Sequence, residues 1–218
     1  MGKSYYNIIE TLAFICCNDE GNFKILLKKK KTDPYKGYWI LPGNILSNEE
    51  TLETSVKNTT YEMTHIIPKK MIQNHVFSDL NRDENERIIA SVYTVIVLKN
   101  LVHENNEYEV KWFNIDDLPK LGYDHEKIIK RTFDSLTKKV IYNQNNILKE
   151  FFPYDFTLGE FQKFWEFIVK EKVDRRNFRK KLISQGFIAQ TGEEDKSKVG
   201  RPSKLYCFTD KLKEGSLV

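Results

Sequence analysis

The sequence lacks the features that mark membrane, secreted and zinc-binding proteins. No apolar run approaches the roughly 18 residues of a membrane-spanning helix, and no long apolar stretch follows the lysine of MGKSYYN, as a signal peptide requires. Cysteine and histidine are too few and too scattered for a zinc site. The cysteines number three, and Cys16 and Cys17 are adjacent, so we expect no disulfide framework and a cytoplasmic location.

Net charge is absent from the first two thirds of the chain. Residues 1–150 hold 21 basic and 21 acidic side chains. Residues 151–218 hold 14 of the 35 Lys and Arg and 10 of the 31 Asp and Glu, so the whole excess of +4 lies there. This asymmetry favours a C-terminal module that meets a polyanion such as nucleic acid. The alternative is a chance excess, because +4 over this length is modest.

What the first part of the chain does contain is a pattern of strands with two helices. Apolar runs at 8–17 and 23–29 flank the turn residues Asn18–Asn22 and predict a hairpin. Further strands are expected at 38–41, 70–77, 87–98 and 108–113, the first of them ended by Pro42-Gly43. Helices are expected from Glu49 to about Thr64, capped by Ser47 or Asn48, and from Asp124 to about Val140. The order predicts an α+β sandwich with a mixed sheet.

The last third has a different pattern. Residues 141–150 carry four amide side chains, and we take them as the boundary between domains 1–142 and 150–218. Thr157 and Glu160 form a predicted capping box, and Asp174 is the expected cap of a second helix that Gly186 closes. Two strands follow, at 187–191 and 203–208. Helix, helix and hairpin in about 55 residues are typical of a winged helix-turn-helix.

The segment Gly43–His65 resembles a Nudix box. The family signature is Gly, five residues, Glu, seven residues, Arg-Glu-aliphatic-x-Glu-Glu and x-Gly-aliphatic. Four positions preserve or approximate it, and four depart from it. The first group is Gly43, Glu49, Lys57 (for Arg) and Glu62; the second is Asn58, Thr59, Tyr61 and Thr64.

These departures bear on chemistry. The box helix of a Nudix hydrolase projects several carboxylates toward Mg²⁺ on a diphosphate, because hard divalent cations prefer oxygen ligands. Glu62 alone survives of three clustered glutamates, since Asn58 and Tyr61 replace the others. We therefore expect a vestigial box with no metal, no cofactor and no catalytic residue. The alternative is an active pyrophosphohydrolase acting on a nucleoside diphosphate derivative.

The C-terminal third resembles the winged-helix half of the Nudix-related transcriptional regulators. The matching segments are FTLGEFQ, DRRNFRKK, GFIAQTGE and GRPSKLYCF, in order and at matching spacing. This resemblance implies a degenerate Nudix sensor joined to a winged helix, acting as a homodimer on a palindromic operator. Regulators of the family control NAD metabolism or sugar use, so the implied effector is ADP-ribose or a related phosphorylated compound.

Candidate contact residues follow from the pattern. The predicted recognition helix sets four basic residues opposite Phe178 and Leu182, as a helix in the major groove would; the alternative is a solvated basic face. Two more cations belong to the predicted hairpin. The predicted DNA contacts are Arg175, Arg176, Arg179, Lys180, Arg201 and Lys204, and the predicted effector contacts are Lys36, Trp39 and Arg87.

Three classes of function remain open from the sequence. The favoured one is a transcriptional regulator with a catalytically dead sensor domain; the others are an active hydrolase and a scaffold or RNA-binding protein without an effector. The carboxylate count of the box argues against the hydrolase. The retained loop PYKGYWILPGN, which leads into the box, argues against the scaffold.

Overall fold

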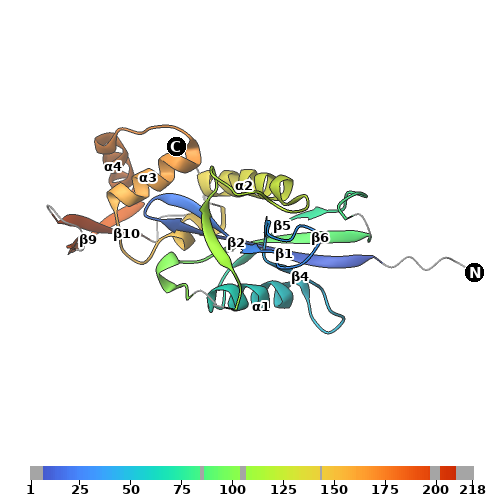
Figure 1. Cartoon of the computed structure of the whole chain (residues 1–218). Helices are drawn as coiled ribbons and strands as arrows, with labels where there is room; N and C mark the ends of the chain where they lie inside the picture. Colours follow the sequence, from blue (N-terminus) through green and yellow to red (C-terminus); the bar gives the residue numbers. More distant parts are fainter. Residues whose placement is uncertain (1–6, 84–85, 104–106, 143, 197–201, 210–218) are drawn as a thin grey trace, which may run out of the picture. The chain divides into compact units, whose positions relative to one another are not determined.

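The computed structural model describes residues 7–83, 86–103, 107–142, 144–196 and 202–209. The chain divides into two compact units (Figure 1). The first contains residues 1–17 and 24–135, and the second contains residues 18–23 and 136–218. None of the described helices is long and apolar enough to cross a membrane.

The first unit is a mixed seven-stranded sheet with a helix on each face (Figure 1). Its central path runs β3-β2-β1-β6-β5, and β4 and β7 pair with β1 and β2. β1 and β6 are parallel, and Ile8 pairs with Ile88. The strands are β1 (Ile8–Asp19), β2 (Asn22–Lys29), β3 (Trp39–Ile40), β4 (Gly43–Ile45), β5 (Met71–Phe77), β6 (Ile88–Ile96) and β7 (Val110–Asn114).

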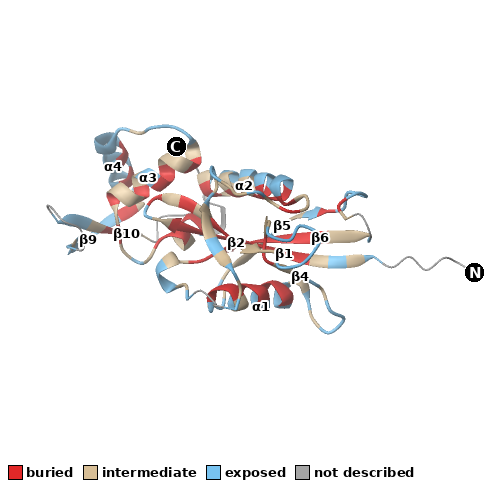
Figure 2. Ribbon diagram, in the orientation of Figure 1, coloured by how far each residue is buried: buried red, intermediate tan, exposed pale blue. Residues whose placement is uncertain are grey.

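The sheet forms where the chain alternates or concentrates apolar residues. The central strands β1 and β6 are buried along most of their length (Figure 2), as their β-branched and apolar composition predicts. The hairpin between β1 and β2 turns at Glu20 (φ 51°) and Gly21 (φ 81°), a pair of left-handed residues that suits a tight two-residue turn. The short strand β4 was missed, because Pro42-Gly43 was interpreted as a stop.

Helix α1 (Leu52–Thr64) begins three residues later than expected. Its cap is Thr51, whose hydroxyl accepts from the Thr54 amide at 3.2 Å. Ser47, one of the two predicted caps, instead joins a preceding turn, in which its amide donates to the Glu50 carboxylate. Helix α2 (His125–Ile141) follows the predicted range, with Ile129, Thr132, Leu136 and Val140 buried. A short 3₁₀ helix, η1 (Lys99–Leu101), lies between β6 and β7.

The second unit contains two helices and a three-stranded sheet. Its elements are η2 (Gln144–Phe151), β8 (Phe156–Thr157), α3 (Leu158–Val169), α4 (Arg175–Ser184), β9 (Ile188–Asp195) and β10 (Ser203–Phe208), in the sheet order β8-β10-β9. The predicted caps are confirmed: Thr157 accepts from the Glu160 amide at 3.2 Å, and Asp174 accepts from the Asn177 amide at 2.8 Å. Gly186 is left-handed at φ 69°.

The core of this unit is aromatic. Phe161, Phe164, Trp165 and Phe178 are buried between the helices and the sheet. Residues 141–150, expected as a plain boundary, contribute η2 with Ile147 and Leu148 fully buried.

The β1–β2 turn also belongs to the second unit. Phe23 is fully buried there, with its ring centroid 5.7 Å from that of Phe151 and 6.3 Å from that of Phe164.

Candidate functional site

The box segment begins at a close approach of two strands. Gly43 opens β4, which pairs antiparallel with β1 so that Gly43 lies opposite Leu12. A Cβ on Gly43 would lie 2.4 Å from the Thr11 carbonyl oxygen. The glycine is therefore required by packing, whether or not the box performs catalysis.

Hydroxyl groups add to the apolar contacts of Val56 and Met63 in holding α1 against the strands. Ser55 and Thr11 share a hydrogen bond of 2.8 Å between their side-chain oxygens. Asn44 of β4 donates to the Thr59 hydroxyl at 2.9 Å. Within the helix, the Thr60 hydroxyl donates to the Val56 carbonyl at 2.8 Å, which satisfies a buried polar side chain. Thr59 stands where the box has an aliphatic residue, and the hydrogen bond from Asn44 explains how a buried threonine is tolerated there.

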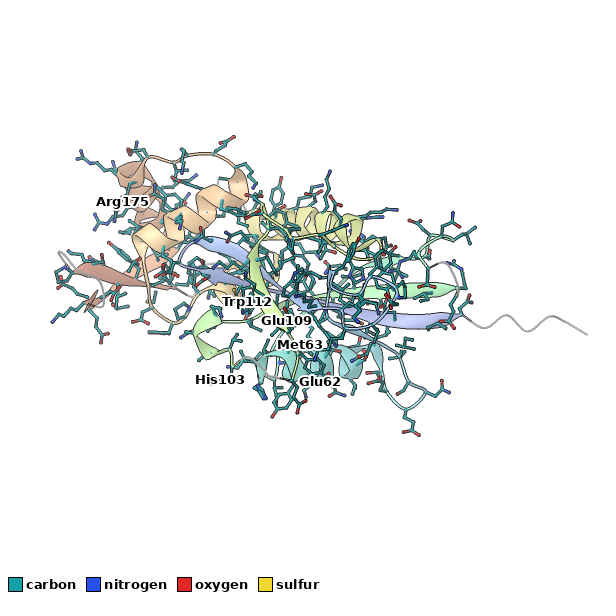
Figure 3. All side chains as sticks on the ribbon, in the orientation of Figure 1. Glu62, Met63, His103, Glu109, Trp112 and Arg175 are labelled. Atoms are coloured by element: carbon teal, nitrogen blue, oxygen red, sulfur yellow. The ribbon has the colours of Figure 1, made fainter. Side chains whose placement is uncertain are left out.

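The solvent side of α1 does not fit a divalent cation. Lys57, Asn58 and Tyr61 are exposed, and the surviving carboxylate of Glu62 is half-buried on the same helix (Figure 3). Glu49 lies in the exposed turn before the helix. Within the described residues, no group of three or more His, Cys, Asp or Glu side chains is placed to hold a metal ion. A single carboxylate cannot supply the oxygen-rich set that Mg²⁺ requires.

A lysine is the charged neighbour of that carboxylate. The Lys28 ammonium of β2 lies 4.3 Å from the centroid of the Tyr108 ring. Partial burial lowers the pKa of Lys28, and the negative charge of Glu62 offsets part of that effect. Lys28 of β2 therefore interacts electrostatically with the surviving carboxylate of the box.

The three predicted effector contacts lie on separate elements. Lys36 is exposed in the loop before β3. Trp39 of β3 packs edge-on against Phe113, with ring centroids 4.8 Å apart. Arg87 donates to the Asp79 carbonyl at 3.1 Å. Their role as effector contacts stays a prediction.

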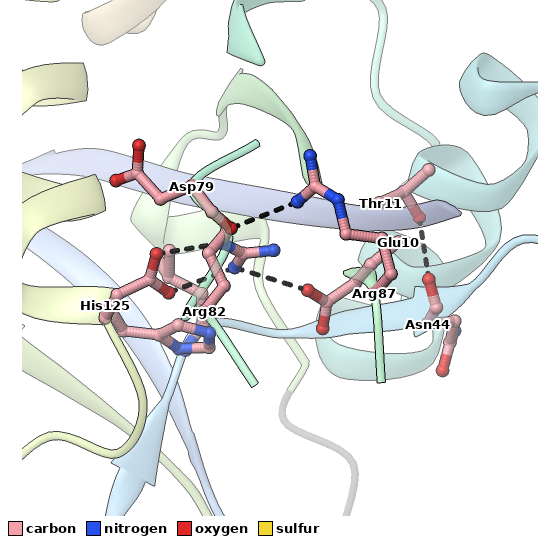
Figure 4. A network of polar contacts seen from close by, with 9 residues as sticks. Glu10, Thr11, Asn44, Asp79, Arg82, Arg87 and His125 are labelled. Atoms are coloured by element: carbon pink, nitrogen blue, oxygen red, sulfur yellow. Dashed lines mark hydrogen bonds and ion pairs between the residues drawn. The ribbon is translucent and has the colours of Figure 1, made fainter. Parts of the chain in front are cut away.

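A buried polar network in the first unit was not predicted (Figure 4). The Arg82 side chain is 4% exposed and donates twice to Asp124, from Nε at 2.8 Å and from Nη2 at 3.0 Å. Nη2 also lies 3.6 Å from the Glu10 carboxylate. Burial raises the pKa of Glu10, and Arg82 offsets part of that rise. A lone carboxylate inside the apolar run 8–17 was the sequence signal for a buried partner.

His125 joins this network from the start of α2. It is 2% exposed, and its Nδ1 accepts from the Leu41 amide at 2.9 Å. Burial lowers the pKa of His125 to about 4. This hydrogen bond joins residues 84 positions apart and ties Leu41, just before the box segment, to the start of α2.

The second unit presents a basic groove. It has a volume of about 740 Å³ and lies between α4, the start of α3 and β10. Phe178 and Leu182 of α4 are buried, whereas the four predicted basic residues of this helix are exposed, Arg175 among them (Figure 3). The predicted DNA contacts that line the groove are Arg175, Arg176, Arg179 and Lys204.

The other predicted DNA contacts differ in their surroundings. Lys180 is exposed but is not among the residues that line the groove. Arg179 is not free, because its Nε donates to the Tyr206 hydroxyl of β10 at 3.0 Å. This bond ties α4 to the hairpin, so Arg179 has a positioning role that the sequence did not reveal. Arg201, the predicted hairpin-tip contact, lies outside the described residues.

Two family models match the chain. The NUDIX domain matches residues 9–132, and the NrtR DNA-binding winged helix domain matches residues 149–208. An ADP-ribose pyrophosphatase of Methanocaldococcus jannaschii is 38% identical over 112 residues, which is 51% of this chain and 66% of that protein. The ADPR responsive transcriptional repressor NtrR of Acinetobacter baylyi is 26% identical over 198 residues, which is 87% of this chain and 77% of that protein.

Solved structures share the fold of the whole chain or of its first part. Shewanella oneidensis NrtR complexed with a 27mer DNA has a TM-score of 0.78 at 24% identity and covers 96% of this chain and 97% of its own. The NUDIX domain of the same protein complexed with ADP ribose has a TM-score of 0.55 at 22% identity, covering 61% of this chain and 90% of its own. The chain belongs to the NUDIX family and carries, behind its NUDIX domain, a DNA-binding winged helix of the NrtR type.

Proposed function

We propose that this protein is a transcriptional repressor whose NUDIX domain senses an ADP-ribose-like effector and whose winged helix binds DNA. One observation carries the proposal: a box that no longer fits a divalent cation is joined to a winged helix with a basic groove. Loss of the metal ligands removes hydrolysis and leaves the fold that binds the substrate. Binding without turnover is what a sensor requires.

The effector assignment is supported by relatives and by charge. A relative that spans 87% of this chain is an ADPR responsive repressor, and the NUDIX domain of Shewanella oneidensis NrtR was crystallised with ADP ribose. Lys28, which interacts electrostatically with Glu62, offers a cation to the vestigial box. Lys36, Trp39 and Arg87 remain the proposed contacts for the rest of the molecule.

For DNA, we propose a homodimer on a palindromic operator. One winged helix covers a half-site, and two copies related by a two-fold axis supply the specificity that one lacks. Arg175, Arg176 and Lys204 are the proposed direct contacts in the groove, with Lys180 and Arg201 as phosphate contacts. Arg179 acts in part through its bond to Tyr206.

Selection of binding sites from a random duplex library, followed by footprinting on the selected duplex, tests this function. We expect a protected two-fold symmetric site that is weakened or lost when ADP-ribose is added and unchanged when ADP is added at the same concentration. A matched variant, Arg175→Glu, reverses one charge of the groove on an exposed position and should abolish protection. Protection that is unchanged at every ADP-ribose concentration would contradict ADP-ribose as the effector. Absence of any protection would contradict the proposal that the protein is a DNA-binding repressor.

A pyrophosphohydrolase is the second candidate, favoured by the 38% identity to an ADP-ribose pyrophosphatase. The identity covers 112 residues, which is 51% of this chain. Asn58 and Tyr61 stand where that chemistry needs carboxylates, so we place binding above catalysis.

A further inference from the structure

The basic groove of the second unit also contains a carboxylate. Glu194 of β9 lines the groove together with Arg175, Arg176, Arg179 and Lys204. It is the one acidic residue among the described residues of this lining. The phosphates of DNA repel a negative charge, so a surface that had only to attract DNA would gain nothing from a carboxylate there. Glu194 therefore contributes something other than general affinity for DNA.

The pairing of the hairpin explains why Glu194 faces the groove. Glu194 lies opposite Lys204 in the antiparallel register of β9 and β10, and the side chains of such a pair lie on the same face. The register shifts between Lys204 and Tyr206, and the left-handed Gly192 (φ 91°) lies in the corresponding stretch of β9. An irregularity of this kind redirects side chains. The adjacent Glu193 is exposed but is not among the residues that line the groove.

The hairpin itself does not use the carboxylate of Glu194. Within the part of the chain that the structure describes, this side chain makes no ion pair or hydrogen bond, although Lys204 is its cross-strand neighbour. Other polar groups of the groove are occupied: Arg179 donates to the Tyr206 hydroxyl, and the Thr157 hydroxyl caps α3. The carboxylate oxygens of Glu194 are therefore open to hydrogen bonds from a ligand in the groove.

The charged side chains around Glu194 are donors. Guanidinium and ammonium groups cannot accept a hydrogen bond. They suit phosphate oxygens and the acceptor atoms of guanine, but they cannot bind the exocyclic amino group of a base. A carboxylate accepts such a group, which is N4 of cytosine or N6 of adenine in the major groove and N2 of guanine in the minor groove. Glu194 thus adds a kind of base contact that the cations of the groove lack.

We infer that Glu194 is a specificity-determining residue, which accepts a hydrogen bond from the exocyclic amino group of one base and repels phosphate from the same place. This inference rests on the proposed function, because it names what one residue of the DNA-binding groove recognises. A duplex without the amino group leaves the desolvated carboxylate without a partner and binds more weakly. A duplex bound in a register that brings a phosphate there is penalised by like charge. Both effects increase the preference for one sequence.

Neutral variants of the two adjacent glutamates test the charge of Glu194. Glu194→Gln removes it, and Glu193→Gln removes the same charge beside the groove; both residues are exposed, so neither change disturbs the core. Anisotropy titrations of the full chain compare a duplex selected by the wild type with a random-sequence duplex. We expect the ratio of the two affinities to fall by about fivefold or more with Glu194→Gln, the effect of one like charge about 4 Å away in water. Glu193→Gln should keep the wild-type ratio, and equal ratios in both variants would overturn the inference.

Base analogues identify the amino group. In the selected duplex each cytosine, adenine or guanine is replaced in turn by 2-pyrimidinone, purine or hypoxanthine, which lack it. We expect one replacement to weaken binding of the wild type by about tenfold and to leave binding of Glu194→Ala unchanged, and the base concerned tells which groove is read. Equal effects of every replacement on both proteins would overturn the inference and leave the proposed function standing. A wild type that prefers no duplex would contradict the proposed function, and the reading role of Glu194 with it.

Discussion

The buried histidine makes the stability of the first unit dependent on pH in a calculable way. Burial lowers the pKa of His125 to about 4, from an ordinary value near 6.5. Because the folded state favours the neutral ring, burial of neutral His125 makes its full contribution to the free energy of unfolding above pH 6.5. That contribution is lost as the pH falls toward 4. The difference between the two pKa values corresponds to a loss of about 3 kcal/mol in the free energy of unfolding once the pH is below both. About 2 kcal/mol of this is lost by pH 5.

A conservative variant isolates this effect from other titrating groups. His125→Asn places a side-chain oxygen near the position of Nδ1, where it can still accept from the Leu41 amide, and it cannot be protonated. We expect the variant to be less stable than the wild type at pH 7.5, because it fills less of the buried site. The difference in unfolding free energy between the wild type and the variant should narrow by about 2 kcal/mol at pH 5, because only the wild type loses the contribution of the neutral histidine.

Urea unfolding between pH 7.5 and 5 measures the gap. Tryptophan emission in a Trp165→Phe background reports on the first unit through Trp39 and Trp112, and the background is shared by both proteins. Glu10 is present in both proteins, so its effect cancels in the comparison. Its effect on stability is opposite to that of His125, because its raised pKa makes protonation in acid favour the folded state. A free-energy gap that stays constant from pH 7.5 to 5 would refute the neutral, buried histidine.

Three further predictions concern the box, the groove and the second core. ADP-ribose with Mg²⁺ or Mn²⁺ should not be hydrolysed, because Asn58 and Tyr61 cannot replace the metal-binding carboxylates; turnover near 1 s⁻¹ would contradict this expectation. The affinity for ADP-ribose measured by calorimetry should be the same in Mg²⁺ and in EDTA. Arg176→Ala should weaken operator binding by about 1–3 kcal/mol with relaxed specificity, whereas Lys180→Ala should weaken binding to all duplexes alike and flatten its salt dependence. Wild-type affinity of both variants in anisotropy titrations would contradict α4 as the recognition helix. Phe23→Ala should destabilise the second unit by about 3–5 kcal/mol, seen as a lower urea midpoint of Trp165 emission, although Phe23 is contributed by the β1–β2 hairpin; an unchanged midpoint would show that its ring is not part of that core.

The elements with strong local patterns were predictable. Apolar alternation located the strands, and Thr157, Asp174 and Gly186 marked the ends of the C-terminal helices through hydrogen bonds within a few residues. The error at α1 has a local cause as well, since Ser47, Asn48 and Thr51 are all capable caps and the Glu50–Ser47 turn decides among them.

Contacts between distant residues were not predictable from one sequence. Arg82 meets Asp124 across 42 positions and His125 meets Leu41 across 84, and no spacing rule links them. Phe23 was assigned to a strand of the first domain, but its ring belongs to the aromatic core of the second unit. The bond from Arg179 to Tyr206 was hidden for the same reason.

The central claim is that effector binding and DNA binding are coupled in one chain, and calorimetry measures that coupling directly. ADP-ribose is titrated into the free protein and into protein saturated with an operator duplex. We predict that the two affinities differ by about 5- to 150-fold, the usual size of an allosteric coupling, with weaker binding to the DNA-bound form of a repressor that ADP-ribose releases. The same ADP-ribose affinity in both titrations would contradict the account.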